Sequence, residues 1–257
     1  MRAQTLPPAA GWQWIIGGFA IFRRNPVMLG MLVVAYWFTV FFLNIVPVLG
    51  ILIASLAIPG LSVGLMQAAR NVERGQPVGL QTLYGSLREN GRTLAILGAL
   101  YLCCTLGVLG LSSLVDGGDL LRFMLAGNRA ERAVVEDADF TWAALFVMLL
   151  MTPVLMAWWF APVLAAWHRL SVGRALFFSF VACWMNWRPF LTYGLGLVVV
   201  AGVLPGVLLG ILLLLVPGAA SLITAIVTLP MMLVVAPTVF ASFYASYRDI
   251  FGISEIV

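Results

Sequence analysis

Few side chains in this sequence combine the type and the spacing that chemistry requires. The one histidine, His168, stands beside Arg169, and a single histidine cannot supply the pair of axial ligands of a b-type haem. We interpret it as a polar residue at a membrane edge. Glu136, Asp137 and Asp139 are close enough in sequence to hold a cation, although acidic residues of a polar loop are usually only hydrated.

The remaining reactive residues indicate no catalytic centre either. Cys103 and Cys104 are adjacent in an apolar run and Cys183 is isolated, so no disulfide framework is indicated. The sequence contains no P-loop, Gly-x-Ser-x-Gly elbow or Cys-x-x-Cys pair. We therefore expect no catalytic residues, no metal, no cofactor and no enzymatic activity.

Composition places the chain in a membrane. Hydrophobic residues make up 63% and charged residues 9% of the 257 residues, whereas about a quarter of a soluble protein is charged. All fourteen basic residues are arginine, which suits a surface that faces lipid phosphates, although codon usage explains the same bias. The net charge of +4 is mild, and no basic cluster interleaves with exposed aromatic residues outside the membrane edge, so no nucleic-acid partner is indicated.

Hydropathy divides the chain into long and short helices. The pattern predicts an all-α polytopic protein with six spans, at residues 27–46, 49–66, 93–115, 140–161, 190–216 and 219–243. Shorter helical segments at 11–24, 79–90 and 167–187 precede the first, third and fifth spans. Segments as short as 11–24 cannot cross a bilayer that needs about 20 residues. We expect these three helices to lie on the membrane surface. Residues 1–10, which we call the lead, are expected to be mobile.

The junctions after the short helices resemble one another. Asn25, Asn90 and Asn186 occupy them, and each is preceded at matching distances by apolar residues. These are Ile15, Leu80 and Leu176 ten residues earlier, and Phe19, Tyr84 and Phe180 six residues earlier. The pattern predicts one membrane domain, 1–257, of three repeat units at 11–74, 79–169 and 172–249. Chance similarity among apolar runs is the alternative.

Charge predicts the orientation. Eleven arginines, Arg2 among them, and four acidic residues lie on one side of the predicted topology and give that side a net charge of +7. The loop 116–139 on the other side has a net charge of −3. Positive loops stay cytoplasmic. The topology therefore places both termini in the cytoplasm and the acidic loop outside. Residues 1–10 lack the pattern of a cleavable signal peptide, so we expect the first span to direct insertion.

Two groups of residues are candidates for interactions. The first is a basic and aromatic inner rim that could grip anionic headgroups or simply anchor the helices; it comprises Trp12, Trp14, Arg23, Arg24, Asn25, Arg88, Asn90, Arg92, Arg169, Arg174, Trp184, Asn186 and Arg188. The second is formed by small-residue steps, Gly60 and Gly64 and then Gly202, Gly206 and Gly210. Such steps allow close helix packing, within the chain or between copies in a homo-oligomer.

Two segments also carry a resemblance. With Phe22-Arg23-Arg24-Asn25-Pro26 and the run from Ala175 to Trp187, the chain resembles uncharacterised six-helix inner-membrane proteins of beta-proteobacteria. More distantly it is similar to the membrane domain fused to some glycerophosphodiester phosphodiesterases. The resemblance implies a bacterial inner membrane and carries over no catalytic residue.

These observations lead to two functional hypotheses. Spans without ionisable groups at mid-depth argue against proton relays and ion-coupled transport. The first hypothesis is therefore a non-enzymatic membrane protein that organises lipid or serves as a scaffold in a larger membrane assembly. The second is a transporter or channel for a small or lipidic solute, with helices kinked by proline around a path.

Overall fold

The computed structural model describes residues 3–46, 48–118, 120, 138–216, 218 and 220–252, with the backbone alone at 138–140 and 220–223. Within these ranges the fold is all-α, as predicted. The elements are α1 (Ala10–Arg24), α2 (Pro26–Leu43), α3 (Leu49–Glu73), α4 (Leu80–Asp116), α7 (Ala138–Trp159), α8 (Ala161–His168), α9 (Val172–Met185), α10 (Trp187–Val198), the π-helical turn η2 (Val199–Val203), α11 (Leu204–Leu215) and α12 (Ala220–Phe251).

Six helical stretches in the described ranges are long and apolar enough to cross a membrane, which agrees with the six predicted spans. They are Pro26–Leu43, Leu49–Glu73, Leu80–Asp116, Thr141–His168, Trp187–Leu215 and Thr224–Phe251. Several are longer than predicted. The third span continues from the short helix before it, and the second and sixth run on into the polar end of the molecule.

The backbone leaves helical geometry at each of the three asparagines. Asn25 separates α1 from α2 (φ −151°, ψ 71°), and Asn186 separates α9 from α10 (φ −112°, ψ 26°). Asn90 kinks α4 (φ −127°, ψ 19°). Only Asn25 caps the next helix, by accepting a hydrogen bond from the Met28 amide at 3.3 Å. The repeat itself stays a prediction, but its three hinges are real backbone features.

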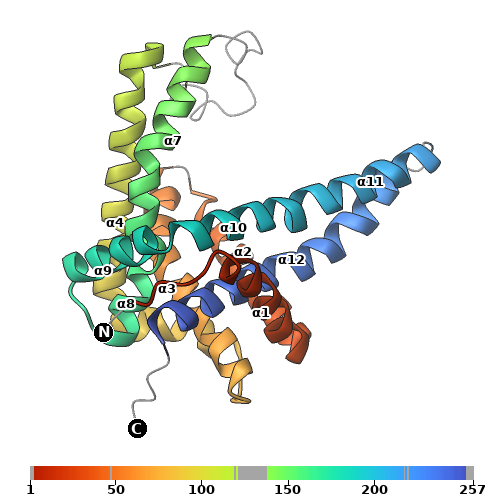
Figure 1. Cartoon of the computed structure of the whole chain (residues 1–257), viewed down its shortest axis with the longest axis horizontal. Coiled ribbons are helices and arrows are strands. Elements are labelled where there is room, and N and C mark those ends of the chain that lie inside the picture. Colours follow the sequence, from red (N-terminus) through yellow and green to blue (C-terminus); the bar gives the residue numbers. More distant parts are fainter. Residues whose placement is uncertain are drawn as a thin grey trace.

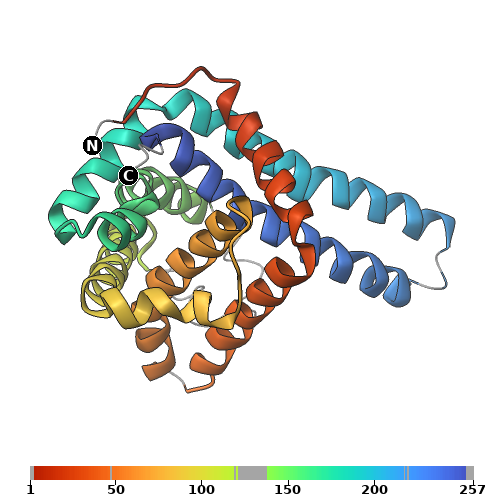
Figure 2. The ribbon, with the colours of Figure 1, turned by 90° about the horizontal axis from the view of Figure 1, so that it is seen from below.

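The spanning helices form pairs that diverge from a common base. In Figure 1, α4 and α7 rise side by side, whereas α11 and α12 extend together in another direction. Figure 2 shows the same divergence from below, with α4 and α7 seen almost end on and α2 and α3 on a third side. We call the region where the pairs meet, which contains α1, α8, α9, residues 80–90 of α4 and the adjoining ends of α3 and α12, the base.

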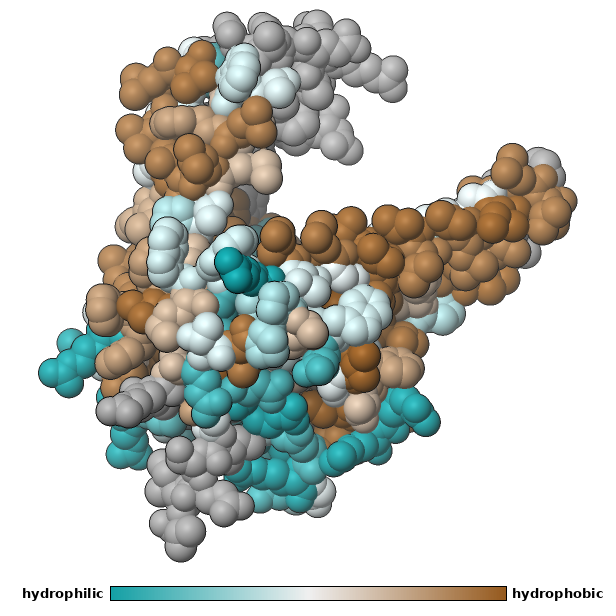
Figure 3. All heavy atoms as spheres, in the orientation of Figure 1, coloured by the Kyte–Doolittle hydropathy of each residue, from teal (hydrophilic) through white to brown (hydrophobic). Residues whose placement is uncertain are grey.

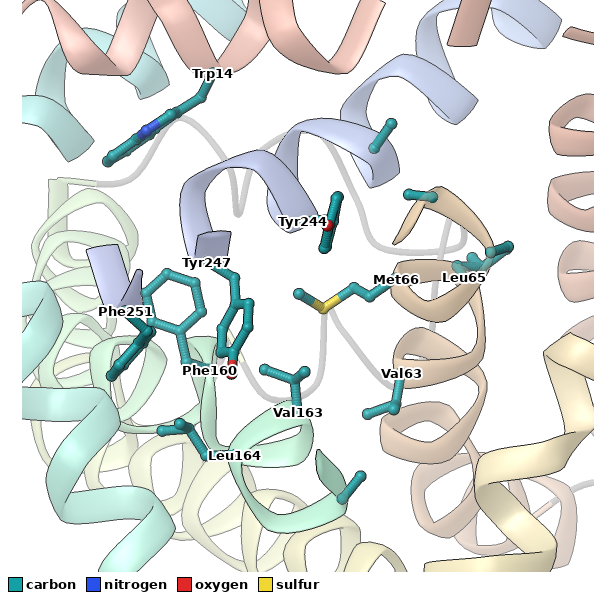
Figure 4. Packing of buried hydrophobic residues seen from close by; sticks show 14 of the residues in the cluster. Trp14, Val63, Leu65, Met66, Phe160, Val163, Leu164, Tyr244, Tyr247 and Phe251 are labelled. Carbon is teal, nitrogen blue, oxygen red and sulfur yellow. The ribbon is translucent and has the colours of Figure 1, made fainter. Parts of the chain in front are cut away.

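The buried core lies in the base. Side chains of α3, α8 and α12 meet there, among them Met66, Val163 and Tyr244 (Figure 4). Small residues let α1 approach its neighbours closely. A Cβ built on Gly18 would lie 2.5 Å from the Thr238 carbonyl oxygen of α12, so only glycine fits at this crossing.

Farther from the base, the paired helices expose apolar surface. Figure 3 shows hydrophobic residues over the extended pairs and hydrophilic residues gathered over the base. No residue of α11 is buried within the chain. In a membrane protein, lipid or another membrane protein covers such a surface.

The predicted mobile lead is wrong for the residues after Ala3. The Gln4 amide donates a hydrogen bond to the Ile250 carbonyl at 2.8 Å. The Leu6 amide donates to Oδ1 of Asn186 at 2.9 Å. The lead therefore ties the end of α12 to the hinge between α9 and α10.

Candidate functional site

The structure divides the aromatic and amide residues of the predicted inner rim between outside and inside. Trp12 and Trp184 are exposed, 44% and 65%, and can face lipid. Trp14 is fully buried, with its ring centroid 5.2 Å from that of Phe190. Asn186 is also fully buried. Within this fold neither Trp14 nor Asn186 can touch a headgroup, because neighbouring helices surround them.

The arginines of the predicted rim all have exposed side chains. They are Arg23, Arg24, Arg88, Arg92, Arg169, Arg174 and Arg188. Two of these arginines contact other residues of the chain. Arg24 donates a hydrogen bond to the Glu73 carbonyl at 2.8 Å, and the Arg188 guanidinium lies 5.3 Å from the Trp187 ring centroid. The others are free to meet headgroups, and the assignment of these arginines to lipid stays a prediction.

The two glycine steps have different surroundings. A Cβ on Gly64 would lie 2.1 Å from the Leu83 carbonyl oxygen, and one on Gly60 would lie 2.3 Å from a methyl carbon of Leu87. Both glycines therefore let α3 pack against α4. Around Gly202, Gly206 and Gly210, no described atom comes within 4 Å of such a Cβ. None of the described residues packs against these three glycines, so packing between copies is the remaining prediction for them.

Sequence reasoning missed a polar network that joins the ends of three helices. Glu73, the last residue of α3, forms an ion pair with Arg248 of α12. It also accepts a hydrogen bond from the Tyr244 hydroxyl at 2.7 Å. Arg24 of α1 reaches the backbone of the same residue. In the sequence, Arg70 follows Pro59 at the same distance as Arg248 follows Pro237. This spacing suggests that the ends of α3 and α12 are equivalent positions, but it does not indicate that they are in contact.

Removing the Glu73 charge is expected to loosen this junction. The two side chains of the ion pair are 30% and 20% exposed, so solvent screens part of their attraction. We expect Glu73→Gln to lower the free energy of unfolding by about 1–2 kcal/mol, between the values for surface and buried pairs. Thermal unfolding in detergent measures this. Arg23→Gln, at an exposed residue outside the network, is the control and should change stability little.

An apolar cavity of about 410 Å³ lies where the diverging pairs meet. Its walls come from α3, α4, α7, α8 and α12. Aromatic rings dominate them, including Tyr101, Trp158 and Phe243, while Ser55 and Ser62 add small hydroxyls. A second apolar cavity of about 590 Å³ lies between α11, α12 and Trp37 of α2. Both volumes are in the range of small-molecule sites, and among the described residues no acidic residue, arginine or histidine lines either of them.

Two adjoining polar cavities, of about 460 and 500 Å³, lie between α3, α4 and α8. They share Glu89, Asn90 and Trp167, and the second also contains Arg70 and Arg169. Sequence analysis placed Asn90 and Arg169 on the rim. It assigned no site to Arg70 or Glu89, because nothing in the spacing of these residues relates α3 to α4 and α8.

The reactive residues singled out earlier are not brought together. Burial raises the pKa of the Cys183 thiol to about 12, so the thiol stays protonated and unreactive at neutral pH. In the described ranges, no three histidine, cysteine or acidic side chains are grouped as a metal site would need. The possible cation site at Glu136, Asp137 and Asp139 lies outside the side chains that the structure describes.

These features define a multi-pass, all-α membrane protein whose buried core lies in the base. Over 99% of its length and 96% of the relative's, the chain is 37% identical to the "Probable inner membrane protein BTH_II0599" of Burkholderia thailandensis. The chain belongs to the family of that protein. This membership confirms the resemblance to inner-membrane proteins and the prediction of a multi-pass inner-membrane protein; the orientation of the termini stays a prediction.

Other comparisons add nothing to this assignment. No family model matches the chain, and no solved structure matches it. The resemblance to the membrane domain of glycerophosphodiester phosphodiesterases has no support from these comparisons.

Proposed function

We propose that this protein is a non-enzymatic membrane protein that organises lipid around its base. The observation that carries the proposal is the apolar cavity between the diverging helix pairs. Its lining is mostly aromatic and aliphatic, and covering such surface from water is favourable. Acyl chains, which are as apolar as the lining, are the material that a bilayer offers to fill it.

The charge distribution supports the same proposal. Exposed arginines surround the base, and Trp12 and Trp184 are exposed among them. Arginine binds phosphate with two parallel hydrogen bonds, and tryptophan favours the headgroup level. With both termini cytoplasmic, as the loop charges predict, the lipids concerned belong to the cytoplasmic leaflet.

Lipid retention tests the proposal. The protein is extracted directly into nanodiscs and then exchanged into detergent, and the lipid that stays bound is quantified by mass spectrometry. We expect retained lipid in the wild type and severalfold less in Ser55→Phe, whose ring would occupy the cavity. Gly107→Phe is the control, because Gly107 has open space around it. A wild-type protein that retains no lipid, or equal retention in both variants, would contradict the proposal.

A scaffold within a larger assembly is part of the same hypothesis. The exposed apolar faces of α10 and α11, with Gly202, Gly206 and Gly210, suit contacts with another membrane helix. The mass of the protein in nanodiscs tests this: a monomer without a partner would oppose it.

A transporter or channel for a small or lipidic solute is the second candidate. The observation that favours it is that two prolines line the apolar cavity. Pro59 lies inside α3, where it interrupts helical hydrogen bonding, and Pro162 stands in the first turn of α8, just after the break between α7 and α8. Solute flux into proteoliposomes that falls in Pro162→Ala or Pro237→Ala would support this function. Absence of flux in the wild type would exclude it for the solutes tested.

A further inference from the structure

The polar cavity between α3, α4 and α8 contains an arginine whose hydrogen-bond donors are unused. Arg70 is partly buried, and its guanidinium carbon lies 4.8 Å from the ring centroid of Trp167. It forms no ion pair or side-chain hydrogen bond with any residue that the structure describes. When a guanidinium group stacks on an aromatic face, the N–H groups in its plane stay available to bind an anion. Arg70 is thus held in place with its donors available.

A second arginine in the cavity has an unusual backbone. Arg169 ends α8 in the left-handed conformation, with φ 51°. Glycine would adopt this conformation without steric cost, whereas in a residue with a Cβ that atom lies too close to the following carbonyl oxygen. The position nevertheless holds an arginine, and its side chain lines the same cavity as that of Arg70. The two guanidinium groups give this cavity its positive charge.

One carboxylate balances part of that charge. Glu89 lines both polar cavities and is exposed. Asn90, next to it, donates a hydrogen bond to the Ala166 carbonyl at 3.4 Å, which connects α4 to α8 across the cavity. Two arginines and one glutamate suit a ligand with a phosphate and a neighbouring ammonium. A ligand with negative charge alone would leave Glu89 unpaired beside it.

The polar cavity that contains Arg70 lies one helical turn from the apolar cavity. Met66 and Pro162 line the apolar cavity, while Arg70 and Ala166 line the polar one, four residues farther along α3 and α8. Four residues in a helix are about one turn, or roughly 6 Å. A molecule with a charged headgroup and apolar chains matches this change of surface better than a wholly soluble one.

We infer that this cavity binds the headgroup of an aminophospholipid, with Arg70 and Arg169 on the phosphate and Glu89 on the ammonium. The inference rests on the proposed lipid-organising function and adds the lipid class and the residues. Phosphatidylethanolamine is the probe with this chemistry, and phosphatidylglycerol has the phosphate without the amine.

Competition in nanodiscs of defined composition tests the inference. The wild type, Arg70→Gln, Arg70→Lys and Glu89→Gln are reconstituted with equal amounts of the two lipids and phosphatidylcholine, and the lipid retained after detergent exchange is identified. We expect the wild type to enrich phosphatidylethanolamine, and Arg70→Gln to reduce its retention by about tenfold. Arg70→Lys keeps the positive charge but loses the paired N–H donors of the guanidinium, so its retention of phosphatidylethanolamine should lie between those of the wild type and Arg70→Gln. Glu89→Gln should abolish the preference over phosphatidylglycerol.

Arg74→Gln is the matched control, because Arg74 is exposed one turn farther along the chain and lines neither polar cavity. It should retain lipid as the wild type does. Thermal unfolding of each variant shows whether it folds, and if Arg70→Gln does not, the exposed Glu89→Gln decides. Soluble glycerophosphoethanolamine is added in a separate arm. Displacement of the retained lipid at equal concentration would overturn the lipid assignment in favour of a soluble ligand.

The outcomes separate the two levels of the proposal. If the wild type retains lipid without preferring the amine headgroup, or if Arg70→Gln retains as much as the wild type, the headgroup site is wrong and the lipid-organising function stands. If the wild type retains no lipid at all, both fail.

Discussion

Gly64→Ala is expected to prevent α3 from packing on the first part of α4. The added Cβ would lie 2.1 Å from the Leu83 carbonyl oxygen and 2.8 Å from its Cα. Both atoms belong to a helix backbone and cannot rotate away, as a side chain could. We expect the free energy of unfolding to fall by about 3 kcal/mol or more, the upper end of what overpacking costs. Thermal unfolding and the yield of monodisperse protein in detergent measure it.

Gly206→Ala is the matched control for this prediction. Gly206 belongs to the other predicted glycine step, and no described atom lies within 4 Å of a Cβ built there. Its replacement should change stability by no more than about 0.5 kcal/mol. If Gly206 packs between copies, the change would appear in the mass of the protein–detergent complex. Equal destabilisation by the two substitutions would contradict the distinction between the steps.

Asn186→Ala is the second substitution with a large expected effect. The Asn186 amide accepts a hydrogen bond from the Leu6 amide and donates to the Gln4 and Ala182 carbonyls, each at 2.9 Å. The side chain is fully buried. Truncation leaves these groups without their partner, and each unsatisfied buried group costs about 1–3 kcal/mol. Because released backbone groups can reach water, we expect a total of about 2–4 kcal/mol.

Hydrogen exchange identifies the cause of this loss. The Leu6 amide should exchange much faster in Asn186→Ala, because its acceptor is gone and the lead separates from the base. Asn25→Ala is the control at the corresponding hinge. Asn25 is exposed and accepts one bond, from the Met28 amide at 3.3 Å, so its replacement should cost about 1 kcal/mol, as for other helix caps. Unchanged Leu6 exchange in Asn186→Ala would show that the lead is held by other contacts.

The glycines show why packing was only partly predictable. The spacing of Gly60 and Gly64 indicated a close helix contact, and the structure has one. The same spacing at Gly202, Gly206 and Gly210 finds no partner within the described chain. Meanwhile Gly11 and Gly18, seven residues apart on one face of α1, make close approaches that the four-residue pattern did not identify. Spacing reports which residues share a face, but not which neighbour that face meets.

The inner rim shows the same division. The arginines are exposed, as their charge requires, because burying an unpaired guanidinium in an apolar core is too costly. Trp14 and Trp12 are both aromatic residues of one short helix, yet Trp14 is buried and Trp12 is exposed. Both sides of α1 are apolar, so hydrophobicity alone does not distinguish the side that faces protein from the side that faces lipid.

The amino-acid sequence by itself determined that this protein lies in a membrane, that it is all-α, and where its six spans and three hinges lie. These depend on local properties: an apolar run long enough for a bilayer must satisfy its backbone internally as a helix. Only the tertiary structure decided that Glu73 meets Arg248, that Asn186 holds the lead, and that Arg70 and Glu89 line one cavity. Those contacts join helices far apart in the chain, and their geometry follows from how the helix pairs diverge.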